Sequence, residues 1–258
     1  MFIQKVVSIK ELMFRGFRIQ YNDPHDTAAI IESYVLNVYR IQKIERGNVV
    51  VDVGAGIGEF AVLASDKVGK EGKVIAIEPS PDDFKTLQDN IRLNRCNNVI
   101  AINSAVSDKK ERLLLKFKGK EFEAEAETLS DILSNLDIAV NSLNYMKMDI
   151  EGGERSVIPS SIDIIRRIDY LAIEIHDGFS SELIPYMSNL GFRFSRIERK
   201  EYLFNAIRQA IIHPFGVYKM WNAFTSTGEK PGFGKILSGI DISKSKELVV
   251  GLFYKSKI

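Results

Sequence analysis

The stretch Val49-Val50-Val51-Asp52-Val53-Gly54-Ala55-Gly56-Ile57-Gly58-Glu59-Phe60 changes abruptly from an apolar run to a glycine-rich turn and then to a helix-like segment. β-branched residues on both sides of Asp52 suit a parallel strand that is covered on both faces. Glycine has no Cβ, so this turn can adopt positive φ and let a ligand lie directly against the backbone. We therefore predict a nucleotide-like cofactor site here. The expected contacts are Asp52, Gly54, Ala55, Gly56 and Gly58.

The spacing of this turn distinguishes between cofactors. It reads G-x-G-x-G, and Glu59 stands where a dinucleotide fingerprint has its third glycine. A pyrophosphate at a helix N-terminus favours N–H donors without a nearby carboxylate, whereas S-adenosylmethionine (SAM) has no phosphate and carries sulfonium and ammonium cations. Asp52 and Glu59 therefore favour SAM over NAD.

Two further strand ends add to the predicted cofactor site. The apolar run at residues 73–77 ends in Glu78, about twenty residues after Gly58, where a carboxylate accepts ribose hydroxyls and repels a 2′-phosphate. Ser104, after the strand predicted at residues 99–103, would lie beside the adenine, although it could equally be an ordinary turn serine. The residues added to the site are Glu78, Pro79, Ser104 and Ala105.

The composition is that of an ordinary globular protein. Of 258 residues, 45% are hydrophobic and 27% charged, and the net charge of +1 favours no nucleic-acid partner. The single cysteine, Cys96, cannot form an internal disulfide. Without an apolar span of about 18 residues or a signal-peptide core, we expect a cytoplasmic protein with no transmembrane segment. Its oligomeric state stays open.

Apolar runs alternate with helix-like segments along the chain, which predicts an α/β fold with a doubly wound, mostly parallel sheet. We expect a single domain over residues 1–258. Residues 1–44 are interpreted as a helical N-terminal extension, with a helix at 28–41 and with His25 as a solvated neighbour of its cap. Residues 107–127 alternate and suggest an edge hairpin.

Residues 198–247 lose regular patterning, are rich in aromatic side chains and contain proline and glycine breakers. A long insertion between two final strands is usually functional, so we interpret it as a lid or acceptor-binding element. Tyr218 and Trp221 could stack on a sugar face or an apolar tail. The apolar and basic stretch at residues 207–221 could also contact a membrane surface. The alternative is an additional packed helix with a surface loop.

Ionisable side chains end two of the predicted central strands. Asp149 and Glu151 are two residues apart, as are Glu174 and His176, so each pair points to one side of its strand. We expect Asp149, Glu174 and His176 to converge at the reacting atoms, with His176 as general base and Glu174 holding it or the acceptor. They could instead hold a divalent cation. Glu151 would contact substrate or stabilise a helix N-terminus, and His176 could be a core histidine.

Several motifs together resemble the FkbM family of methyltransferases. These are VVVDVGAGIGEF, IEP, SAVSD, MKMDIEGGE and LAIEIHD, within residues 28–194. The residues that match the K-x-D-x-E-G-x-E motif are Lys147, Asp149, Glu151, Gly152 and Glu154. The resemblance implies the class I fold, a Rossmann-like seven-stranded sheet with an antiparallel last strand. It also implies SAM as cofactor and O-methylation of a small molecule, possibly a sugar or glycolipid.

Two features depart from this resemblance. Ser104 stands where class I enzymes commonly have an acidic residue, and residues 198–247 match no known part of the family. Two other functions remain open on the sequence. One is an NAD-dependent oxidoreductase, and the other is a SAM-binding protein without turnover.

Overall fold

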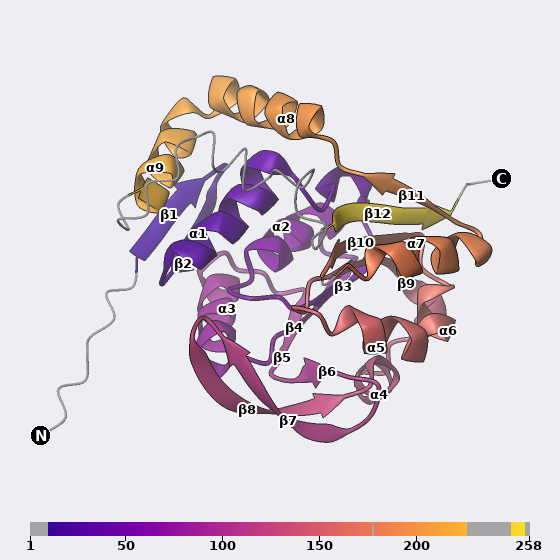
Figure 1. Cartoon of the computed structure of the whole chain (residues 1–258). Helices are drawn as coiled ribbons and strands as arrows, with labels where there is room; N and C mark the ends of the chain where they lie inside the picture. Colours follow the sequence, from indigo (N-terminus) through magenta and orange to yellow (C-terminus); the bar gives the residue numbers. More distant parts are fainter. Residues whose placement is uncertain (1–9, 177, 226–248, 256–258) are drawn as a thin grey trace, which may run out of the picture.

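The computed structural model describes residues 10–176, 178–225 and 249–255, and its centre is a seven-stranded sheet in the order β11-β12-β10-β9-β3-β4-β5 (Figure 1). The strands are β3 (Val49–Val53), β4 (Lys73–Ile77), β5 (Val99–Ile102), β9 (Leu143–Met148), β10 (Tyr170–Ile175), β11 (Phe192–Arg196) and β12 (Val249–Lys255). Only β12 runs antiparallel, against both β10 and β11. The predicted α/β class and doubly wound sheet are confirmed.

Strand order reverses between β3 and β9, because the chain first adds β4 and β5 on one side and later β9 and β10 on the other. Ligands of such sheets bind beyond the carboxyl ends of the strands at this reversal. The glycine-rich turn follows β3 directly, and Asp149 follows β9 directly. The topology thus brings the two most informative sequence motifs to one place.

Alternation along each strand divides the core between the two faces of the sheet. Val50 packs on one face, whereas Val51 and Val53 pack on the other. Helices cover both faces (Figure 1). The first face carries α2 (Glu59–Val68) and α3 (Pro81–Leu93), and the second carries α4 (Leu129–Asn135), α5 (Glu154–Ser160), α6 (Ile162–Ile165) and α7 (Ser180–Asn189). A short 3-10 turn, η3 (Val140–Ser142), leads into β9.

The expectation of a helical N-terminal extension is wrong for residues 10–21. They form an antiparallel hairpin of β1 (Lys10–Phe14) and β2 (Phe17–Tyr21). Arg15 and Gly16 make the turn, with φ of 52° and 87°. The inward side chains of the hairpin are Leu12, Phe14, Ile19 and Tyr21. Their alternation is typical of a half-buried strand.

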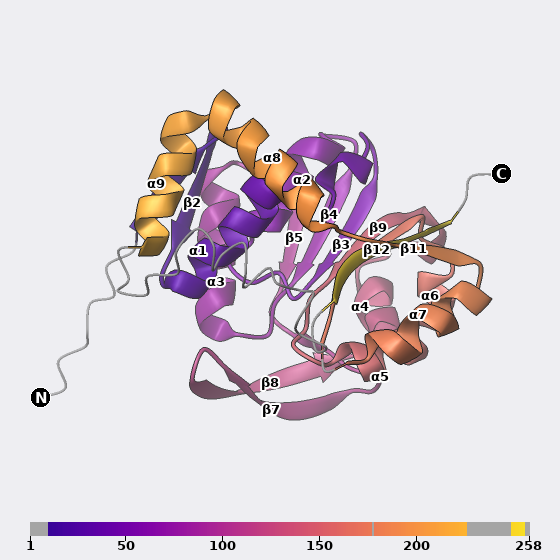
Figure 2. The same cartoon turned by 45° about the horizontal axis from the view of Figure 1, so that its top comes forward.

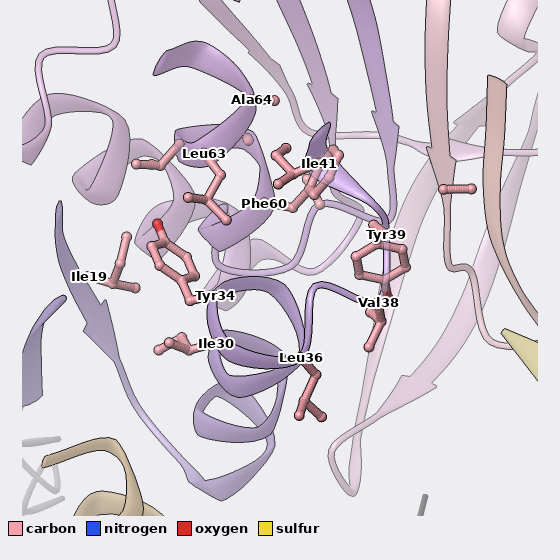
Figure 3. Close-up of a cluster of buried hydrophobic side chains, with 14 of the residues drawn as sticks. Ile19, Ile30, Tyr34, Leu36, Val38, Tyr39, Ile41, Phe60, Leu63 and Ala64 are labelled. Atoms are coloured by element: carbon pink, nitrogen blue, oxygen red, sulfur yellow. The ribbon is translucent and has the colours of Figure 1, made fainter. Parts of the chain in front are cut away.

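The helix expected at residues 28–41 ends early. α1 (Pro24–Ile31) continues into a π-helical turn, η1 (Glu32–Leu36), and stops at Asn37, whose φ is 56°. A short 3-10 turn, η2 (Ile41–Lys43), then leads towards β3. The break lets Tyr39 turn inward, where its ring meets that of Phe60 edge to face at 5.6 Å (Figure 3).

The predicted hairpin at residues 107–127 is present, but it does not extend the edge of the main sheet. β7 (Glu111–Phe117) and β8 (Lys120–Glu127) form a separate sheet with the short β6 (Ala105–Val106). Figure 2 shows this small sheet on the side of the main sheet where the parallel strands end. It therefore covers the region where a ligand is expected.

The tip of the β7–β8 hairpin is fixed to the starts of α1 and α3. The Lys118 ammonium contacts Asp26, lies 3.0 Å from Asp83 Oδ1 and lies 3.4 Å from Asp23 Oδ2. Next to it, Lys120 pairs with Asp82 on the surface. Ion pairs thus hold the hairpin across the carboxyl ends of the strands.

The loss of regular structure expected at residues 198–247 is wrong for its first half, which forms α8 (Arg199–Ile212) and α9 (Pro214–Thr225). Both helices pack against the N-terminal region, α8 on η1 and α9 on α1 and β1 (Figures 1 and 2). The remainder, residues 226–247, lies outside the described residues. None of the described helices combines the length and the apolar character needed to cross a bilayer.

The Lys118 contacts predict a measurable stability difference. In Lys118→Ala, the carboxylates of Asp26 and Asp83, whose side chains are 2% and 5% exposed, lose their cation. We expect a loss of about 2 kcal/mol, since an uncompensated buried charge is destabilising. In a domain of this size this lowers Tm by roughly 4 to 8 °C.

Lys120→Ala is the matched control in the same turn. Its side chain is 72% exposed and that of Asp82 is 69% exposed. Exposed ion pairs contribute roughly 0 to 1 kcal/mol, so this variant should melt close to wild type. Calorimetry that finds equal melting temperatures for the two variants would contradict the proposed attachment of the hairpin.

Candidate cofactor and acceptor site

A cavity of about 580 Å³ lies between the carboxyl ends of the central strands and the β7–β8 hairpin. Most of the predicted cofactor residues line it, and so does the predicted substrate residue Glu151. The predicted residues that line the cavity are Gly54, Ala55, Gly56, Glu78, Pro79, Ser104, Ala105, Asp149 and Glu151. The hairpin contributes a further, apolar wall that includes Leu113, Leu115 and Phe117.

Close backbone approach explains the first glycine of the turn. A Cβ on Gly54 would lie 1.8 Å from the carbonyl oxygen of Asp149, so no larger residue fits between β3 and β9. Gly56, with φ of 53°, donates its N–H to Glu78 Oε2 at 2.7 Å. The turn is therefore shaped by its two neighbouring strands before any ligand binds.

Glu78 is a buried carboxylate held at the cavity wall. Its Oε1 accepts the Ser80 N–H at 2.7 Å, and its side chain is already oriented by Gly56. Burial raises the pKa of Glu78 to about 7, against the lowering effect of these two backbone donors. Each carboxylate oxygen keeps a free lone pair, so Glu78 can accept hydroxyl groups from a ligand.

Two predicted cofactor contacts, Asp52 and Gly58, are not among the residues that line the cavity. Asp52 is fully buried and faces Lys147 Nζ at 3.3 Å, because the strand register places the two side by side. Gly58 is the N-cap of α2, and a Cβ there would lie 2.3 Å from Leu87 Cδ1. Its function is therefore the close packing of α2 against α3.

Glu59 does line the cavity, as the preference for a cationic cofactor requires. Its side chain is buried, and Ser33 Oγ donates to it at 3.4 Å. Burial raises the pKa of Glu59 to about 7. Ser104 also lines the cavity, but its Oγ lies 3.0 Å from the carbonyl oxygens of both Ala105 and Glu125. Its hydroxyl is thus already bonded to the backbone.

Lys147 is a buried cation that sequence reasoning included in the family motif but did not assign to the site. Its ammonium donates to the Gly54 carbonyl oxygen and lies 5.2 Å from the centre of the Tyr39 ring. Burial alone would lower its pKa, but the charges of Asp52 and Asp149 raise the pKa above its ordinary value. Lys147 therefore stays protonated and balances the surrounding carboxylates.

The ends of β9 and β10 bring three polar side chains together beside the cavity. Ile173 pairs with Met148, so the next residues, Glu174 and Asp149, are neighbours. Tyr39 donates its hydroxyl to Asp149 Oδ2 at 2.9 Å and lies 3.4 Å from Glu174 Oε2. Burial, together with the charges of Asp149 and Glu32, raises the pKa of Glu174 well above its ordinary value.

His176 is held by Glu154 rather than by Glu174. Its Nδ1 lies 3.0 Å from Glu154 Oε1, while Nε2 lies 3.6 Å from Glu151 Oε2 and 3.7 Å from Glu174 Oε1. Burial alone would lower the pKa of His176. The pKa of His176 is nevertheless raised overall. The hydrogen bond to Glu154 and the negative charges of Glu154, Asp149 and Glu151 outweigh the effect of burial.

Asp149, Glu174 and His176 lie near one another, but only one of them faces the cavity. Asp149 lines the cavity, whereas Glu174 and His176 lie beside it and do not line it. Among the described residues, one donor atom each from Asp149, Glu151 and His176 lies within 4.8 Å of the others. The ligands of a divalent cation here would thus be Asp149, Glu151 and His176, and Glu174 would not be one of them.

Other cavity residues escaped the sequence analysis. Tyr39 was assigned to a helix, and only the break after η1 turns it inward. His25 is exposed beside the cap of α1, as predicted, but it also borders the cavity. Its ring meets Phe117 of the hairpin edge to face at 5.0 Å and lines the cavity. Contacts of this kind join segments distant in sequence, so no local pattern indicates them.

Tyr218 and Trp221, the other predicted substrate contacts, are not brought to the cavity. They lie on α9, which packs on α1 and β1, and no described residue of α8 or α9 lines the cavity. The lid interpretation is therefore wrong for residues 199–225. The β7–β8 hairpin covers the cavity instead.

Comparison with known proteins gives the family. Residues 52–194 match the methyltransferase FkbM domain. A hexuronic acid methyltransferase, AglP, from Haloferax volcanii is 26% identical over 174 residues, which are 62% of this chain and 71% of that protein.

Among solved structures, a putative transferase from Pyrococcus horikoshii has a TM-score of 0.49 at 15% identity, covering 97% of this chain and 73% of its own. Trm5b from Pyrococcus abyssi has a TM-score of 0.45 at 16% identity, covering 75% of this chain and 51% of its own. This chain thus spans about half of the latter protein. Similarities this low support no inference about a substrate.

The family match has more weight, since it includes the glycine-rich turn, Glu78 and the segment from Lys147 to Glu154. Because it extends over more than half of the residues, this chain belongs to the FkbM family of SAM-dependent methyltransferases.

Proposed function

We propose that the protein transfers the methyl group of SAM to a hydroxyl of a small molecule, with a sugar or glycolipid as the acceptor. The observation that supports this best is the cluster of Tyr39, Asp149 and Glu174 beside the cofactor cavity. Such groups can bind and orient a polyhydroxylated acceptor. The similarity to a hexuronic acid methyltransferase points to the same acceptor class.

The carboxylates of the cavity fit the proposed cofactor. Glu78 can accept the ribose hydroxyls, and Glu59 faces the same cavity as a partner for a positive charge. When bound, SAM supplies an electrophilic methyl group. The chain's own task is to hold the acceptor oxygen close to that group, which accounts for a large part of the acceleration in such displacements.

A hydroxyl must lose its proton as it becomes a nucleophile. We assign this proton to His176 Nε2, because Nδ1 is already held by Glu154 and Nε2 faces Glu151 and Glu174. The upward shift of the His176 pKa makes it a stronger base near neutral pH. Glu174 then orients the acceptor together with Asp149 and Tyr39, rather than holding the histidine.

The alternative functions are tested by ligand binding. We expect calorimetry to detect SAM and S-adenosylhomocysteine but not NAD, because Glu59 replaces the third fingerprint glycine. Glu78→Ala should weaken SAM binding by about 1.5 to 3 kcal/mol, the range for hydrogen bonds to a charged group. Glu182→Ala, an exposed carboxylate on α7, is the control and should bind as wild type. Unchanged affinity in Glu78→Ala would remove Glu78 from the site.

The base and metal mechanisms differ in their response to EDTA. His176→Ala and Glu174→Gln should lower kcat while retaining SAM affinity, and His176→Ala should lose roughly 10² to 10⁴ of the rate. With base catalysis, EDTA has no effect on the wild type. If EDTA abolishes activity and Mg²⁺ restores it, a cation at Asp149, Glu151 and His176 replaces the base. Nearly full kcat in both variants would exclude both residues from the chemistry.

The hydrogen bond that His176 Nδ1 makes to the Glu154 carboxylate predicts a shift in the pH profile. The reaction needs His176 unprotonated, so kcat falls as the pH drops below its pKa. Glu154→Gln keeps the shape but removes a charge that raises this pKa. The acidic limb of the pH profile of kcat should therefore move to lower pH. If kcat drops without movement of this limb, Glu154 is not the group that tunes His176.

A further inference from the structure

Helices α8 and α9 expose an unusual number of large apolar side chains on the surface that faces away from the core. We call this surface the outer face. Its residues, with their exposed fractions, are Phe204 (67%), Ile207 (52%), Ile211 (75%), Ile212 (53%), Phe215 (81%) and Tyr218 (63%). Soluble monomers rarely expose apolar patches of this extent unless the patch binds something.

The outer face is distinct from the face that packs on the protein. Tyr202 and Ala206 of α8 and Met220 of α9 are buried against the core. Phe204, Ile207 and Ile211 recur at the spacing that places them together on the opposite side of α8. The helix therefore has two apolar stripes, of which the outer has no packing partner among the described residues.

The charged side chains of this segment are all positive. From Tyr202 to Thr225 the sequence contains no Asp or Glu, whereas Arg208 and Lys219 are present and exposed. Apolar side chains accompanied by Lys and Arg without acidic residues are typical of helices that lie in the interface of a membrane with anionic lipids. We infer that the outer face of α8 and α9 docks on an anionic membrane surface.

The charges also argue against a second copy of this chain as the occupant. In a two-fold symmetric contact the same face meets itself, so Arg208 and Lys219 of both copies would come together. No carboxylate between residues 202 and 225 could neutralise them. An anionic bilayer supplies both the apolar phase and the opposite charge.

Docking through this face would also set the orientation of the enzyme. The inner side of α8 is tied to the segment that carries Tyr39, through Arg40 with Glu201 at 2.9 Å and Asn205 Nδ2 with the Leu36 carbonyl at 2.8 Å. An α-helix with its side chains is about 10 Å thick. The membrane surface would therefore lie about one helix diameter from Leu36 and Arg40, which flank Tyr39 in the sequence. Membrane docking does not depend on the proposed methylation chemistry.

The test is co-sedimentation of the full chain with vesicles of phosphatidylcholine alone or mixed with phosphatidylglycerol. We expect binding to the mixed vesicles that weakens as salt is added, because salt screens charges. Phe204→Ser combined with Ile211→Ser should lower the vesicle affinity at least about tenfold, since both apolar anchors are lost. Arg208→Glu combined with Lys219→Glu should lower affinity for the anionic vesicles to a similar extent.

Matched controls use exposed residues elsewhere. Tyr186→Ser on α7 and Lys70→Glu before β4 should bind vesicles as wild type. All variants should keep the wild-type Tm and affinity for S-adenosylhomocysteine, because they alter exposed side chains away from the cavity. Wild-type protein that stays in the supernatant with anionic vesicles would overturn the proposal. So would serine variants that bind normally, or an outer face that proves by ultracentrifugation to join two copies instead.

Discussion

The buried ammonium of Lys147 is the interaction on which the rest of the site depends. A cation in the middle of a parallel sheet is costly unless opposite charges and hydrogen bonds surround it. Here Asp52 lies beside it in register, and the Gly54 carbonyl accepts from it. The end of β3 is thereby attached to β9 at the point where strand order reverses. Gly54 then has to be glycine, because the Asp149 carbonyl occupies the space of a Cβ.

The same cation explains how so many carboxyl groups share one edge of the sheet. Its charge lowers the pKa of Asp52, Glu59 and Glu78, although burial raises each of them overall. Glu32 and Glu174 are less well compensated, and the pKa of Glu32 reaches about 8, mainly through burial. Glu59 and Glu78 thus line the cavity, whereas Glu32 and Glu174 lie beside it. Carboxyl groups on the cofactor side suit a cofactor with positive charge.

The sequence predicted the sheet, and most of the residues expected to contact the cofactor line one cavity, because these signals are local. Apolar runs, glycine spacing and Glu78 lie within short segments whose chemistry can be interpreted directly. The hairpin at residues 10–21 was missed although Arg15-Gly16 and the flanking alternation indicated it. α8 and α9 were missed for a physical reason. Large apolar side chains stand on both sides of these helices and Pro214 interrupts the stretch, so an additional packed helix was only the alternative interpretation.

The acceptor side was only partly predictable, because it is built by contacts between distant segments. Tyr39 reaches Asp149 and Glu174 only because the chain breaks at Asn37. The pairing of His176 with Glu154, rather than Glu174, depends on how α5 starts after β9. Lys118 crosses from the hairpin to α1 and α3, a connection without any local signal.

We expect the cavity beneath the β7–β8 hairpin to hold SAM. The most direct measurement is a crystal structure of the full chain with S-adenosylhomocysteine. In that structure we expect the ribose hydroxyls to bind the Glu78 carboxylate and the sulfur to lie on the side of Asp149. A ligand bound elsewhere, or one whose ribose makes no contact with Glu78, would contradict this expectation.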